Sequence, residues 1–119
     1  MIKIAQRTYI NIPSEFKLVL TELTDKDGNV IDFGVVRLIF DFKDAINNSF
    51  IAVYDPVTET YEHTSYDENT GELTIFFDEY NLKPGQLSCQ IGTITNDGEF
   101  SDSKWNFYTS REQINIVLI

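Results

Sequence analysis

The chain has 119 residues, and its 19 acidic residues against 9 basic ones give a formal net charge of −10. A chain of this length builds one domain, expected here to span 1–119, and an apolar share of 42% is too high for disorder. The negative charge argues against a nucleic-acid partner, because phosphate binding requires clustered Lys and Arg. No apolar run has the length of a membrane span or a signal peptide, so we expect a soluble domain without an export signal.

Apolar and polar residues alternate with a period of two along most of the chain, which is typical of strands with one buried face. Turn residues such as Asp27-Gly28-Asn29 and Asn96-Asp97-Gly98 separate the alternating runs. The pattern therefore predicts an all-β sandwich or barrel of about seven to eight antiparallel strands, the first pair being the least defined. The candidate segments, nine when the uncertain first pair is included, are roughly 2–10, 16–24, 34–43, 50–55, 60–66, 72–77, 86–95, 104–109 and 113–119.

Segment 78–85 separates two well-defined strands by about eight residues. One interpretation is a crossover from one sheet to the other, in which Leu82 closes the core and Pro84-Gly85 turns the chain back. An ordinary connection between neighbouring strands is the alternative.

The sequence has few candidates for catalytic or metal-binding residues. His63 is the one histidine, and it has no partners at the spacing of a zinc site or a Ser-His-Asp triad. Cys89 shares a strand face with Leu87 and Ile91, so we expect a buried, unreactive thiol. The acidic residues that start at Asp25 lack the glycine and glutamate of a calcium loop. We therefore expect no enzyme, no cofactor and no metal.

Five tyrosines raise carbohydrate binding as a second class of function. They provide a possible stacking platform for a carbohydrate if several of them lie exposed and coplanar. The alternative is packing in the core or at its rim, which the alternating positions of the aromatic residues favour. The candidates are Tyr54, Tyr61, Tyr66, Tyr80 and Tyr108.

The two ends of the chain are rich in isoleucine. A strand that is apolar on both faces must be covered on both, and an uncovered one invites association. The last strand is therefore either central in the domain's own sheet or an interface with another subunit. We take the second reading as the candidate protein interface, formed by Ile114, Ile116, Val117, Leu118 and Ile119, with Ile2 and Ile4 behind them.

Five segments carry a resemblance to a known family, and together they span most of residues 14–95. They are 16–20 (FKLVL), 27–32 (DGNVID), 38–42 (LIFDF), 70–75 (TGELTI) and 81–87 (NLKPGQL). With these segments the chain resembles the immunoglobulin-like virion domains of tailed phages. The similar proteins are the N-terminal domain of phage baseplate upper proteins and stand-alone proteins of crAss-like phages of gut Bacteroidetes.

The resemblance implies an immunoglobulin-like β-sandwich that acts as a non-enzymatic structural protein of the virion. Baseplate proteins continue into a stem and a receptor-binding region, whereas this sequence stops at Ile119. That difference favours a head-decoration or head-fibre component over a tail or baseplate adaptor. The expected partners are a phage capsid protein or another virion protein, and further copies of the chain in a homo-oligomer. A carbohydrate-binding module is the other alternative.

Overall fold

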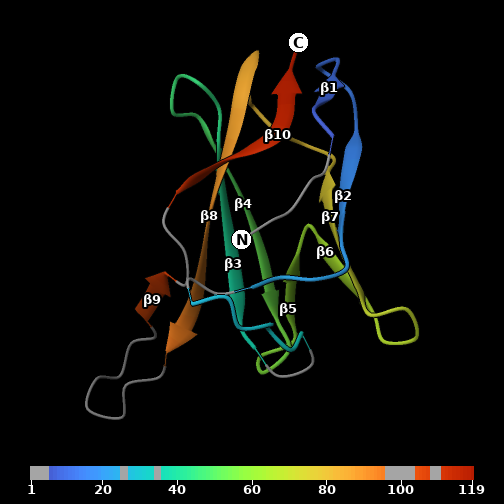
Figure 1. Ribbon diagram of the computed structural model, residues 1–119, viewed down its shortest axis with the longest axis vertical. Coiled ribbons are helices and arrows are strands. Elements are labelled where there is room, and N and C mark those ends of the chain that lie inside the picture. Colours follow the sequence, from blue (N-terminus) through green and yellow to red (C-terminus); the bar gives the residue numbers. More distant parts are fainter. Residues whose placement is uncertain (1–5, 25–26, 34–35, 96–103, 108–110) are drawn as a thin grey trace.

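The computed structural model describes residues 6–24, 27–33, 36–95, 104–107 and 111–119, with the backbone alone for 94–95 and 104–107. Ten strands and no helix are found within these residues (Figure 1). None of the described residues thus provides a helix able to cross a membrane. The strands are β1 (Thr8–Ile10), β2 (Phe16–Leu20), β3 (Leu38–Lys43), β4 (Ser49–Asp55), β5 (Thr60–Glu62), β6 (Thr64–Asp67), β7 (Glu72–Phe77), β8 (Gly85–Thr95), β9 (Lys104–Phe107) and β10 (Glu112–Leu118).

The strands form two sheets that pack face to face, which confirms the predicted all-β sandwich. The larger sheet has seven strands, in the order β1-β10-β8-β3-β4-β5 with β9 paired to β8 beside this path. The smaller sheet has the order β2-β7-β6. Figure 1 shows the smaller sheet beside β4 and β5, with the lower half of β8 extending away from it. The immunoglobulin-like assignment stays a prediction.

The alternation in the sequence places the core between the two sheets. In β3, for example, Leu38, Phe40 and Phe42 are fully buried, whereas the residues between them are half-buried on the outer face. Phe42 and Phe77 meet edge to face across the two sheets, with ring centroids 5.0 Å apart. Such contacts bury large apolar areas, which is the main force that holds two sheets together.

The crossover interpretation of segment 78–85 is confirmed. Residues 78–84 lead from β7 in the smaller sheet to β8 in the larger one. Leu82 is buried in the core within this connection, as predicted. Tyr80 packs beside Phe16, and its hydroxyl accepts a hydrogen bond from the backbone N–H of Ser14 over 2.9 Å.

Two details differ from the predicted strand pattern. Segment 60–66 is divided at His63, whose φ of 58° breaks the extended backbone and moves the chain from β5 in one sheet to β6 in the other. At the opposite edge, β1 pairs parallel to β10, with Tyr9 opposite Val117, so the strand pairs are not all antiparallel.

Candidate functional site

Strand β10 lies inside the domain's own sheet, between β1 and β8. Ile114, Ile116 and Leu118 point inward and are buried in the core, so the prediction that they form a protein interface is wrong for these three residues. The physical reason is the pleat: alternate residues of a strand face opposite sides, and this face of β10 belongs to the hydrophobic core. Ile2 and Ile4 lie outside the described residues.

Polar contacts hold β10 in place at both ends. At its start, Arg111 donates to the carboxylate of Asp41 on β3 over 2.7 Å and to the hydroxyl of Ser88 on β8 over 3.2 Å. Beyond its end, Ile119 donates its N–H to the carbonyl of Ile10 over 2.8 Å. β10 is therefore a structural element of the sheet, and only its outer face is available to a partner.

Ile119 remains available at the end of this strand, where it belongs to an exposed apolar end of the sandwich. Gly85 pairs with Leu118, and a Cβ atom added to Gly85 would lie only 2.8 Å from the Cβ atom of Ala45. The β3–β4 loop thus lies over the start of β8, beside the end of β10. Ile46 of this loop is 67% exposed and Ile119 is 50% exposed. We call these two side chains the apolar end.

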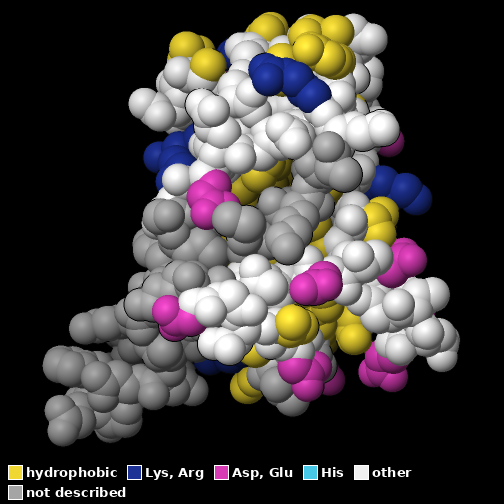
Figure 2. Space-filling view, in the orientation of Figure 1, with side chains coloured by type: hydrophobic (Ala, Val, Ile, Leu, Met, Phe, Trp, Pro, Cys, Tyr) yellow, Lys and Arg dark blue, Asp and Glu magenta, His cyan; other side chains and the backbone are white. Residues whose placement is uncertain are grey.

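Ile46 and Ile119 are exposed at the same end of the sandwich, because Ala45 and Leu118 both lie beside Gly85. Figure 2 shows separate groups of apolar side chains at the top of the molecule, with a basic side chain beside them. Exposed apolar side chains at one end of a domain are candidates for binding a partner. We therefore take the apolar end as the candidate docking site.

A buried carboxylate fixes the loop that carries Ile46. Asp44 accepts hydrogen bonds from the backbone N–H groups of Ile46, Asn48 and Lys83 at 2.8–2.9 Å, and from the Asn48 side-chain amide. Burial alone raises the pKa of Asp44, but these hydrogen bonds outweigh burial and hold it below its usual range. Ile46 is therefore presented by a rigid turn, which lowers the entropy cost of docking.

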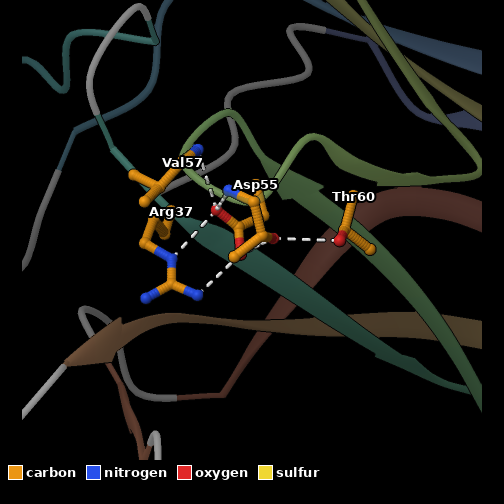
Figure 3. Close-up of polar contacts among 5 residues, drawn as sticks. Arg37, Asp55, Val57 and Thr60 are labelled. Atoms are coloured by element: carbon orange, nitrogen blue, oxygen red, sulfur yellow. Dashed lines mark hydrogen bonds and ion pairs between the residues drawn. The ribbon is translucent and has the colours of Figure 1, made fainter.

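A second buried carboxylate organises the opposite end of β4. Asp55 receives two hydrogen bonds from the Arg37 guanidinium at 2.8–2.9 Å and further ones from the backbone N–H groups of Val57 and Thr58 (Figure 3). Burial raises the pKa of Asp55, yet its partners lower it further, to about 2. Both charges are paired, so the cluster stabilises the turn between β4 and β5 and has no free acid or base.

His63 and Cys89, the two residues considered for reactivity, lie in surroundings that indicate a structural role. The Nδ1 atom of His63 lies 2.7 Å from an oxygen of Asp78, and the His63 ring packs against Phe50. Cys89 is buried, and burial raises the pKa of its thiol above the usual range. Among the described residues, no group of three acidic, histidine or cysteine side chains is placed to hold a metal ion.

Three of the five candidate tyrosines come together in one hollow of about 380 Å³, which we call the tyrosine hollow. Their rings are not coplanar: the planes of Tyr61 and Tyr66 make angles of 42° and 64° with that of Tyr54. Tyr80 lies elsewhere, and Tyr108 is outside the described residues. The hollow is lined by Tyr54, Pro56, Tyr61, Thr64, Ser65, Tyr66 and Glu68.

Comparison with known proteins adds no identity to these features. No family model matches the chain, and no significant match was found among curated proteins or solved structures.

Sequence reasoning missed Ile46 as a candidate docking residue. Its signal was present, because an isoleucine directly before Asn47-Asn48 stands in a turn, where an apolar side chain has no core to enter. That Ile46 and Ile119 lie at the same end of the sandwich depends on the close approach of Ala45 to Gly85, which no local pattern reveals.

Proposed function

We propose that this chain is a non-enzymatic structural protein of a tailed phage particle, a head-decoration or head-fibre component located on the virion. It docks through the apolar end onto another copy of itself or onto a phage capsid protein. The resemblance of its sequence to immunoglobulin-like virion domains supports the phage particle as the setting. The apolar end supports docking as the mechanism, and it is the single observation on which the mechanism depends.

The charge of the chain is compatible with this role. A net charge of −10 makes free copies repel one another over about 10 Å at moderate ionic strength, which keeps them apart before assembly. The exposed side chains of the apolar end carry no charge, so contact there is opposed only by the overall repulsion. Salt weakens that repulsion and strengthens apolar contacts, so docking is expected to increase with ionic strength.

The geometry gives less support to the carbohydrate alternative, and an experiment on phage particles separates the adaptor alternative from the head component. A carbohydrate platform needs coplanar exposed rings, and the rings of Tyr61 and Tyr66 are tilted by 42° and 64° from that of Tyr54. A tail or baseplate adaptor would use the same docking mechanism at another place on the particle. Separating purified heads from tails and detecting the chain by mass spectrometry distinguishes this adaptor from the head component.

Light scattering of the purified protein tests the docking mechanism. The test variant is I46Q/I119Q, which removes the apolar surface and keeps the net charge and the backbone hydrogen bonds of Ile46. The matched control is V30Q/V57Q, because Val30 and Val57 are 68% and 63% exposed and lie on other connections, between β2 and β3 and between β4 and β5.

The wild type and the control are expected to gain mass as concentration and salt rise, while I46Q/I119Q stays monomeric. Equal association of all three proteins would exclude the apolar end as the contact. A wild type that stays monomeric throughout would exclude self-association and leave the capsid protein as the partner.

A further inference from the structure

The tyrosine hollow has a different chemistry from the apolar end and lies on other elements. Tyr54 belongs to β4, Tyr61 to β5 and Tyr66 to β6, so the hollow opens where the chain passes from the larger sheet to the smaller one. Tyr54 and Tyr61 are register partners, with ring centroids 5.6 Å apart. The Tyr66 centroid lies 5.9 Å from that of Tyr54. Three aromatic rings with different orientations thus border one space.

Hydrogen bonds fix the walls of the hollow in advance. The buried Tyr54 hydroxyl donates to the carbonyl of Phe33 over 2.5 Å, and the Phe33 ring packs edge-on against Tyr66. The Thr64 hydroxyl donates to the carbonyl of Val53 over 2.6 Å, which ties β6 to β4. A hollow held in this way needs little reorganisation to accept a ligand.

The electrostatic environment of the hollow is negative. Glu68 lines it, and none of the described lining residues is Lys or Arg. Burial first, and then the nearby Tyr61, Tyr66, Glu68 and Asp32, raise the pKa of Tyr54 to about 12. The Tyr54 phenol therefore stays neutral at physiological pH, and the carboxylate of Glu68 supplies the negative charge at the hollow.

We propose that the tyrosine hollow binds a methylated ammonium group, such as the trimethylammonium head of choline. Aromatic faces carry negative charge density, so rings that surround a space attract an organic cation, and a carboxylate at the rim adds to the attraction. A volume of about 380 Å³ is at the lower end of the range for ligand pockets and suits a small molecule. Tilted rings suit a compact, rounded cation better than a flat sugar ring, which needs a flat platform.

The test is an NMR titration of the full chain with choline, beside its neutral isostere 3,3-dimethylbutan-1-ol. We expect saturable shifts of backbone amides around the hollow with choline and at least about threefold weaker binding of the neutral compound, because the cation–π contribution is lost. Equal binding of the two compounds, or no saturation by choline at tens of millimolar, would overturn the proposal.

Four variants test whether choline binds in the tyrosine hollow. Tyr61→Ala and Glu68→Gln are each expected to weaken choline binding at least about threefold, whereas Tyr61→Phe keeps the ring and is expected to bind as the wild type does. Tyr9→Ala is the matched control, because Tyr9 is 59% exposed on β1 and Tyr61 is 50% exposed. Unchanged binding in Tyr61→Ala, or equal loss in Tyr9→Ala, would contradict the assignment.

Two further arms separate the sources of the cation. Phosphatidylcholine vesicles present the same group on a membrane, and a peptide with trimethyllysine presents it on a protein. Flotation with vesicles, or peptide binding, in the absence of any choline shift would overturn the small-molecule assignment. Choline binding that neither probe displaces supports the small molecule, whereas displacement by vesicles or by the peptide would assign the trimethylammonium group to that source. None of these outcomes depends on docking through the apolar end.

Discussion

Asp55 shows how one side chain organises a whole end of the sandwich. Its carboxylate holds the Arg37 guanidinium through two hydrogen bonds and closes the turn after β4 through the N–H groups of Val57 and Thr58. Each partner lies within a few residues of Asp55 except Arg37, which is 18 residues earlier in the sequence. The cluster therefore links the segment before β3 to the turn between β4 and β5.

Removing the charge of Asp55 is expected to be costly. In Asp55→Asn the nearly buried Arg37 keeps its charge and loses its counter-ion, which costs about 3 kcal/mol for a buried pair. Urea denaturation gives the free energy of unfolding directly. Glu79→Gln, an exposed substitution of the same kind, is the control and is expected to change it by less than about 0.5 kcal/mol. An Asp55→Asn protein as stable as the wild type would mean that Arg37 is solvated.

The same residue predicts a pH dependence. The pKa of Asp55 is about 2 in the folded protein and 3.8 in an unperturbed carboxyl, so the folded state favours the ionised form. Its contribution to stability is therefore complete above about pH 4 and is lost as the pH falls through 2. The stability difference between wild type and Asp55→Asn, measured by urea denaturation from pH 7 to pH 2, is expected to shrink over that range. A constant difference would show that Asp55 does not titrate in this way.

The sequence predicts the burial of single residues well where the local pattern of apolar residues alone determines it. Cys89 and Leu82 are buried as their strand and loop positions indicate. The pair of Arg37 and Asp55 was not predicted, because both residues occupy positions that alternation assigns to the outer face of the sheet. Only the turn that folds back over Asp55 covers that end of the strand.

At the scale of elements, β10 is a core strand whose inward face contributes to stability. Leu118→Ala is expected to lower the free energy of unfolding by about 2–5 kcal/mol, because it leaves a cavity in a closed core. Ile119→Ala, one residue later and half exposed, is expected to change it by less than about 0.5 kcal/mol. Thermal denaturation of both variants provides the comparison, and equal losses would indicate that β10 is not oriented as described.

Gly85 lies between the β3–β4 loop and the end of β10, because it packs closely against Ala45 and pairs with Leu118. Its φ of +136° is a backbone conformation that other residues rarely adopt, and an added Cβ atom would lie 2.8 Å from the Cβ atom of Ala45. Gly85→Ala is therefore expected to destabilise the protein by more than about 2 kcal/mol.

Gly71→Ala serves as the control for Gly85→Ala in urea denaturation. Gly71 also has a positive φ of +72°, but the space around its Cβ position is open, so a loss of about 1 kcal/mol is expected. If the two substitutions cost the same, the close approach of Ala45 has no energetic importance.

Strand positions were predicted from the sequence more fully than strand neighbours. Most runs with a period of two are strands in the structure, because local alternation reflects burial on one face. The parallel pairing of β1 with β10 connects residues more than one hundred positions apart, as between Thr8 and Ile116. No local pattern encodes such a pairing, so the sequence alone did not show that β10 lies between two strands of its own sheet.

At the scale of the whole molecule, the two sheets enclose an apolar core, and the features available to partners lie at the ends of the sandwich. The apolar end and the tyrosine hollow are on different elements and have different chemistries. Acidic side chains are scattered over the lower half of the face that Figure 2 shows. This distribution suits a small module that is positioned by one end and keeps other surfaces free.

Incorporation into phage particles tests the central claim most directly. Particles from infected cells that supply the wild type, I46Q/I119Q or V30Q/V57Q are purified, and the chain is quantified in each by mass spectrometry. We expect the wild type and V30Q/V57Q in a fixed ratio to the capsid protein, and I46Q/I119Q folded in the lysate but missing from the particles. Equal incorporation of all three proteins, or absence of the wild type from the particles, would contradict docking through the apolar end.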